Sequence, residues 1–155
     1  MFETPSIRTA LPLLVLKKLC LALIGAYLAI GLTAGYRAYH QIKSVDLRTP
    51  LVVKPESSIE TSVVTYGRTF LDERVELIQG QQAETLSFHR IPNNRWAFLD
   101  PRTRRVSNNT MLSEDVLKRF QTGRAIVRLT VTGLPQLGHV PPPMVSEAAI
   151  EIQRD

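Results

Sequence analysis

The sequence predicts a single-pass membrane protein in which one N-terminal transmembrane helix carries a small, mainly β extramembrane domain. Three observations predict it: an uncharged apolar run near the N-terminus, short alternating segments after that run, and a basic excess confined to the first 43 residues. We expect an interfacial tail over 1–18, the transmembrane helix over 19–39 and the β domain over 40–155. A chain of 155 residues has room for one such domain and its anchor.

The apolar run Leu19–Tyr36 contains no charged residue. Its 18 residues reach about 27 Å as a helix, close to the ~30 Å hydrocarbon thickness of a bilayer. Lys17 and Lys18 precede the run, and their ammonium groups can snorkel to lipid headgroups. Tyr39 follows it and fits the aromatic belt at the opposite interface. The earlier apolar stretch 11–16 either extends the span or lies in the interface.

A cleaved signal peptide is the main alternative for this segment. Such a peptide has a shorter apolar core and a small-residue cleavage site, whereas residues 33–38 read TAGYRA. We therefore expect a retained signal anchor. The positive-inside rule favours neither orientation, because equal numbers of basic residues flank the two sides of the run. The short N-terminal tail with paired lysines then favours an extracytoplasmic domain, with the anchor in a bacterial inner membrane and the domain in the periplasm.

Small residues cover two opposite faces of the predicted helix. At ~100° per residue, one face contains Ala22, Gly25, Ala26, Ala29 and Thr33. The other face contains Gly31, Gly35 and Ala38. Small side chains let neighbouring helix backbones approach closely, although glycine and alanine are also common in membrane helices that pack against nothing. The pattern predicts a helix that packs between two neighbouring membrane helices.

The β domain is predicted from alternating apolar residues and from turn residues between them. The expected strands are 45–53 (interrupted by Pro50), 59–66, 74–78, 84–88, 96–99, 124–132 and 146–152. One short helix is expected over Glu114–Gln121, with Ser113 as its N-cap and Gly123 beyond its end. About seven strands at near-regular spacing predict an antiparallel, immunoglobulin-like β-sandwich, and a small β-barrel is the alternative.

Charge and cysteine content exclude two classes of function. Residues 1–43 carry five basic side chains and one acidic one, whereas 44–155 carry 14 basic and 13 acidic ones. The basic excess therefore belongs to the membrane segment, and the β domain lacks the basic footprint that a nucleic-acid-binding domain needs. The single cysteine, Cys20, lies in the apolar run, so the domain can form neither an internal disulfide nor a thiolate metal site.

Neither a catalytic site nor a cofactor site is predicted. His40, His89 and His139 are not spaced as metal ligands, and no nucleophile elbow, phosphate-binding loop or dinucleotide fingerprint occurs. The nearest candidate for a soft metal ion is His139 with Met144 on one proline-rich loop, as a metal-delivery assembly factor would need. Two ligands without partners do not make a site. We therefore expect a non-enzymatic protein.

Two features of the domain are candidate contacts for partners or lipid headgroups. Arg102, Arg104 and Arg105 cluster near Arg95 and Trp96, and guanidinium groups suit carboxylates and phosphates. Pro141, Pro142 and Pro143 form a stiff, pre-extended segment that can dock with little loss of entropy. The simpler interpretation of the arginine cluster is a solvated turn, and that of the proline segment is a rigid linking loop.

A formal glycosylation sequon, Asn108-Asn109-Thr110, applies only in a eukaryotic secretory host.

These features favour a non-catalytic accessory subunit of a multi-protein membrane complex, for example a respiratory, photosynthetic or envelope complex. The expected partners are membrane lipid and other membrane-protein subunits, with no nucleic acid. The alternative is a membrane-anchored module that binds a ligand or glycan on its loops.

Overall fold

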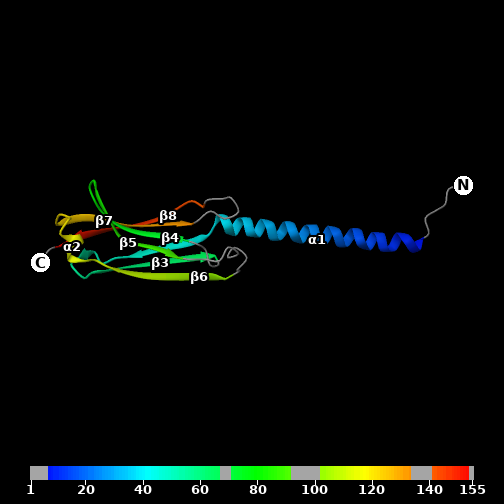
Figure 1. The fold of residues 1–155 in the computed structure, drawn as a ribbon, viewed down its shortest axis with the longest axis horizontal. Helices are drawn as coiled ribbons and strands as arrows, with labels where there is room; N and C mark the ends of the chain where they lie inside the picture. Colours follow the sequence, from blue (N-terminus) through cyan, green and yellow to red (C-terminus); the bar gives the residue numbers. More distant parts are fainter. Residues whose placement is uncertain (1–6, 67–70, 92–101, 134–140, 154–155) are drawn as a thin grey trace. The chain divides into compact units, whose positions relative to one another are not determined.

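The computed structural model describes residues 7–66, 71–91, 102–133 and 141–153 (Figure 1). The chain forms two compact units, Met1–Tyr36 and Arg37–Asp155. The first consists of most of one long helix, and the second is a mainly β domain. The predicted class, an N-terminal apolar helix followed by a small β domain, is confirmed.

Helix α1 runs over Ile7–Tyr39, a length of 33 residues. Its segment Leu14–Tyr36 has a mean hydropathy of 1.9, which makes it long and apolar enough to span a membrane or to act as a signal anchor. The helix begins earlier than Leu19, and it includes the stretch 11–16. The apolar residues along Leu14–Tyr36 are mostly exposed in the single chain, as a lipid-facing helix requires.

The β domain contains two hydrogen-bonded sheets among its described residues. Sheet A has the order β1-β3-β6 and sheet B the order β2-β8-β7-β4-β5. The strands are β1 Ile42–Arg48, β2 Val52–Val53, β3 Ser58–Tyr66, β4 Leu71–Gln79, β5 Gln82–Ile91, β6 Thr103–Met111, β7 Gly123–Gly133 and β8 Met144–Ile152. All neighbouring strands are antiparallel except β2, which pairs with β8 in parallel.

Turn chemistry explains two of the connections. Pro50 has no amide hydrogen to donate to a ladder, and it lies between β1 in sheet A and β2 in sheet B, so the chain changes sheets there. Gly80 adopts φ +62 between β4 and β5, a conformation that glycine reaches at low cost. The predicted break at Pro50 is confirmed, and Gly80 lies in the hairpin that joins β4 to β5.

Strict alternation of buried and exposed residues brings the inner faces of both sheets into one core. On β7, Ala125, Val127, Leu129 and Val131 are buried, and the residues between them face outward. The buried side chains of β3 and β4 join the same cluster. Because this cluster contains residues of both sheets, sheet A and sheet B bury their apolar faces against each other.

The short helix α2, Glu114–Leu117, closes one end of this core (Figure 1). Ser113 caps it by accepting a hydrogen bond from the Val116 amide, as predicted. The helix is shorter than the predicted segment that ended at Gln121, because the chain turns at Lys118 to bury Phe120. Phe120 is fully buried in the core.

Strand β6 was not predicted. The sequence there reads TRRVSNNTM, and its inward positions Arg104, Asn108 and Thr110 are polar, so no apolar alternation marks it as a strand. The predicted strand 96–99 lies outside the described residues.

Close approach, rather than an unusual φ angle, requires a glycine at position 133. A Cβ atom added there would lie 2.5 Å from Cγ of Pro141 and 2.6 Å from Oε1 of Gln41, both shorter than real contacts allow. Gln41 is fully buried and the Pro141 ring is rigid, so neither can move away at low cost.

We predict that Gly133→Ala lowers the free energy of unfolding by about 1–3 kcal/mol through overpacking. Denaturant unfolding of the full chain in detergent, followed by circular dichroism of the β signal, measures the change. Thr132→Ala, on the outer face of the neighbouring position, serves as the control and should cost less than about 1 kcal/mol. Equal stability of Gly133→Ala and the wild type would contradict the close approach.

Candidate binding surfaces

The outer face of sheet A is a polar trough. Its strands place three residue rows side by side: Ser44, Val64 and Arg105; Asp46, Ser62 and Ser107; and Arg48, Glu60 and Asn109. The middle row has short side chains, whereas long side chains stand at both flanks. The difference in length leaves a concavity of about 390 Å³ across the sheet.

The trough offers hydroxyls, an amide and charged groups of both signs. Arg48 donates to Asp46 at 3.2 Å, so part of its charge is internally compensated. Such a surface can form many hydrogen bonds with a polar ligand. It contains no aromatic side chain among the residues that line it, so a sugar ring would have no stacking platform in the described part of the trough.

The outer face of sheet B is more apolar. Ile78, Ile126 and Ala149 form one row across β4, β7 and β8. Phe88 and Val145 lie at the edges of another row and are 49% and 54% exposed. Arg74 and Thr130 lie between Phe88 and Val145 in that row, so apolar and polar side chains alternate across this face.

Ion pairs cross the same face between the apolar side chains. Arg128 donates to Glu147 at 2.6 Å across β7 and β8. Arg90 holds Asp72 with two hydrogen bonds, of 2.8 and 3.1 Å, across β5 and β4. The Arg90 hydrogen bond lowers the pKa of the Asp72 carboxyl from its ordinary value, with partial burial opposing this and the charges of Arg90 and Arg74 adding to it.

A buried carboxylate lies between the two sheets. Glu73 of β4 points inward, is 1% exposed, and accepts hydrogen bonds from the Thr61 hydroxyl and the Asn108 side-chain amide of sheet A. The hydroxyl of Thr110 donates to that of Ser87 at 2.9 Å nearby. This polar cluster joins sheet A to sheet B through Glu73, a residue not predicted to lie inside the domain. Glu73 shares the alternate positions of β4 with Leu71, Val75 and Leu77. This spacing in the sequence could have predicted that Glu73 faces the core.

The same cluster determines whether the sequon at Asn108 is accessible for glycosylation. The Asn108 nitrogen, which a glycan would modify, donates to Glu73 inside the domain. Thr110 of the sequon is also buried. The folded domain therefore withholds this sequon from modification.

The predicted helix-packing residues all lie on α1. A Cβ atom added at Gly25, Gly31 or Gly35 would meet nothing within 4 Å, so these positions open onto free space in the single chain. The six residues selected for helix packing, all exposed, are Ala22, Gly25, Ala26, Ala29, Gly31 and Gly35.

The predicted arginine cluster lies at the start of β6 rather than in a turn. Arg102 and Arg105 are exposed and Arg104 is half-buried on the inward side. Arg95 and Trp96 lie outside the described residues. Of the three prolines, Pro141 is buried next to Gly133, and Pro142 and Pro143 are exposed.

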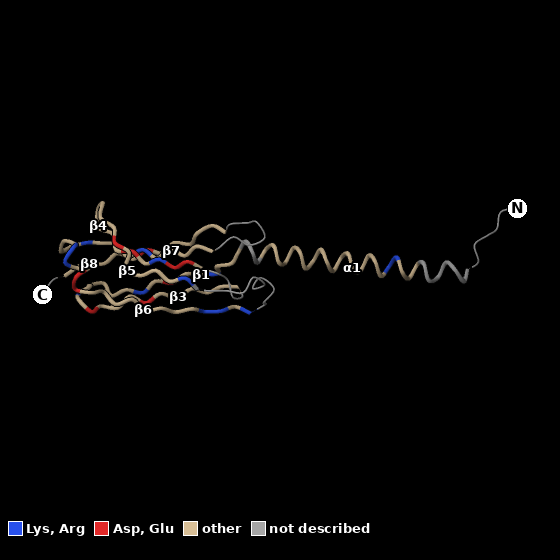
Figure 2. Tube along the Cα trace, viewed as in Figure 1, with Lys and Arg blue, Asp and Glu red and all other residues tan. Residues whose placement is uncertain are grey.

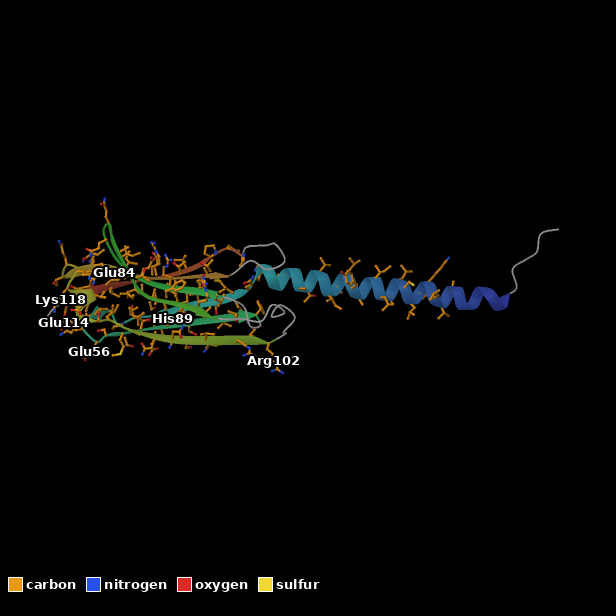
Figure 3. All side chains as sticks on the ribbon, in the orientation of Figure 1. Glu56, Glu84, His89, Arg102, Glu114 and Lys118 are labelled. Atoms are coloured by element: carbon orange, nitrogen blue, oxygen red, sulfur yellow. The ribbon has the colours of Figure 1, made fainter. Side chains whose placement is uncertain are left out.

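The histidines remain separate where the structure describes them. His40 lies just after α1, and His89 is exposed on β5 (Figure 3). His139 lies outside the described residues, and its predicted companion Met144 packs against the core. Among the described residues, no three His, Cys, Asp or Glu side chains are grouped to hold a metal ion.

No protein-family model matches this sequence, and no curated protein matches it. Distant likenesses exist among solved structures. The superoxide reductase (neelaredoxin) from Ignicoccus hospitalis is 9% identical, with a TM-score of 0.42 over 72% of this chain and 82% of that one. The alkylpurine DNA glycosylase AlkC of Pseudomonas fluorescens is 13% identical, with a TM-score of 0.40 over 73% of this chain and 30% of that one.

A third likeness is to the CARDB domain of the PF1109 protein from Pyrococcus furiosus, whose structure was solved in complex with di-metal ions. It is 13% identical, with a TM-score of 0.37 over 74% of this chain and 91% of that one. At these identities and scores, no activity or ligand transfers to this protein.

We predict that Glu73→Ala lowers the free energy of unfolding by about 2–4 kcal/mol, because it leaves Thr61 and Asn108 without their acceptor inside the domain. Chemical unfolding of the full chain in detergent measures the loss. Glu76→Ala is the matched control: it removes the same residue type from the outer face of the same strand, where Arg74 lies 3.8 Å away, and should cost less than about 1 kcal/mol. Similar losses for the two variants would contradict the bridging role of Glu73.

Proposed function

We propose that this protein is a non-catalytic accessory subunit of a multi-protein membrane complex. In this proposal α1 spans the membrane beside the helices of other subunits, and the β domain docks onto their extramembrane surface. The observation that carries the proposal is the outer face of sheet B, where Phe88, Ile126 and Val145 are exposed between complementary ion pairs. An apolar surface crossed by charge pairs suits a protein partner that can match both features.

The small-residue faces of α1 support the membrane half of this proposal. Gly31 and Gly35 lie about 120° around the helix from Gly25 and Ala29, and all four are open to close approach by another backbone. A helix with two such faces fits between two neighbours rather than beside one.

We infer that the β domain is an immunoglobulin-like sandwich rather than a barrel. Naming β1, β3 and β6 as strands A, B and E gives sheet A the order A-B-E. Naming β4, β5, β7 and β8 as C, C′, F and G gives sheet B the order G-F-C-C′. This partition is the one that immunoglobulin-type domains use.

The proposed location is a bacterial inner membrane, with the β domain in the periplasm. Lys17 and Lys18 at the start of the apolar segment, after a short tail, support an anchor that leaves its N-terminus in the cytoplasm.

A second candidate function is a membrane-anchored module for a polar ligand or glycan. The trough on sheet A favours it, since a concavity of about 390 Å³ lined by hydroxyls and charged groups is large enough for a small polar molecule. The two functions differ in what accompanies the protein when it is isolated.

Affinity purification of the tagged full chain in a gentle detergent, with mass spectrometry of the bound proteins, tests the proposal. We expect a stoichiometric set of membrane subunits. Gly31→Leu and Gly35→Leu should reduce that set at least about tenfold, because an interface built on small residues has no room for a leucine.

Leu23→Phe is the control for this experiment, because it adds bulk to α1 between the two small-residue faces. It should leave the recovered set unchanged. Recovery of the wild-type chain alone would contradict the accessory role and favour the ligand-binding module.

A further inference from the structure

The β domain has two ends of different charge. The end at which the chain arrives from α1, here called the tether end, contains the start of β1, the end of β3 and the start of β6. The register fixes this, since Ile42 pairs with Thr65 and Tyr66 with Thr103. The matching ends of sheet B join it, because Gln41 and Gly133 approach each other closely.

We take the tether end to include the three nearest residues of each strand together with Gln41, Arg102 and 141–143. Among the described residues, this set contains five basic and two acidic side chains. The same count at the opposite end, including its turns and α2, gives five basic and seven acidic ones. Figure 2 shows the basic residues at the start of β6, and Figure 3 places Arg102 at one end of the domain and Glu56 and Glu114 at the other.

The basic residues of the tether end are Lys43, Arg90, Arg102, Arg104 and Arg105. Arg90 is compensated by Asp72, and Arg104 is half-buried on the inward side. Lys43, Arg102 and Arg105 are exposed. The ammonium group of Lys43 lies 5.9 Å from the centre of the Tyr66 ring, a pairing of residue types that membrane interfaces favour.

The covalent link keeps this end near the apolar segment of α1. Three helical residues and two linking residues separate Tyr36 from Ile42, which amounts to at most about 15 Å of chain. Strands of seven to eleven residues separate the two ends of the domain by ~20–30 Å.

We propose that the tether end binds the anionic headgroups of the lipids around α1, through the phosphate oxygens that Lys43, Arg102 and Arg105 contact. This inference rests on the proposed role of α1 as a membrane anchor. Guanidinium groups suit phosphate through paired N–H donors, and an ammonium group acts as a point charge. Headgroup binding would hold the domain against the membrane in one pose.

The test uses the full chain with Cys20→Ser, a fluorophore on Ser44→Cys near the tether end, and a nitroxide quencher on the lipid headgroups. Vesicles of phosphatidylcholine are compared with vesicles that also contain anionic phosphatidylglycerol. We expect stronger quenching with phosphatidylglycerol, and we expect high salt to remove the difference. Arg102→Gln with Arg105→Gln should lower the ratio of docked to undocked domain about 30-fold.

Lys54→Gln with Arg124→Gln removes the same charge at the opposite end and should leave the quenching unchanged, as should Arg102→Lys with Arg105→Lys. Equal quenching in the two vesicle types, or no effect of the tether-end glutamines, would overturn headgroup binding. Loss of quenching in the lysine variant would also overturn it, because that variant keeps the charge. An alkaline wash checks the anchor separately: every variant should stay on the vesicles, and release would overturn the anchor itself.

Discussion

Only two residues, His40 and Gln41, separate α1 from β1, and this short link constrains how the β domain can act. Gln41 is already buried in the domain, where its carbonyl accepts a hydrogen bond from the Tyr66 amide at 3.0 Å. If α1 spans a membrane, the end of the domain that contains Gln41 has to stay close to the lipid surface. The same end contains the basic side chains Lys43, Arg102 and Arg105 and the close approach of Gln41 and Pro141 to Gly133.

The inner faces of the sheets are committed to stability, which leaves the outer faces for function. Apolar residues of both sheets form one core, and Glu73 adds a polar bridge to Thr61 and Asn108 within it. A buried carboxylate is costly unless its hydrogen bonds are satisfied, so it specifies which strands face each other more than it adds net stability. Sheet A and sheet B then present different surfaces, one a polar trough and the other apolar with ion pairs, which is why two classes of partner can be considered.

Alternation of apolar residues was enough to predict most of the sheet strands. β3, β7 and β8 lie close to their expected ranges because β-branched or aliphatic residues occupy most of their inward positions, and Ser113 marked the start of α2 correctly. β6 could not be predicted, since its inward Asn108 and Thr110 are polar and become understandable only with Glu73 and Ser87 opposite them. The trough was missed for a similar reason: Ser44, Ser62 and Ser107 are unremarkable in sequence, and only the register of three strands places them in neighbouring rows.

The central claim is that α1 remains attached as a membrane anchor. Alkaline extraction of membranes from cells expressing the full chain, followed by intact-mass measurement of the recovered protein, tests it most directly. If α1 is a retained anchor, the protein stays in the membrane pellet with the segment Leu14–Tyr36 still present in its mass. Recovery of a soluble chain that has lost this segment would identify it as a cleaved signal peptide, and it would remove the basis for the tethered, lipid-facing domain.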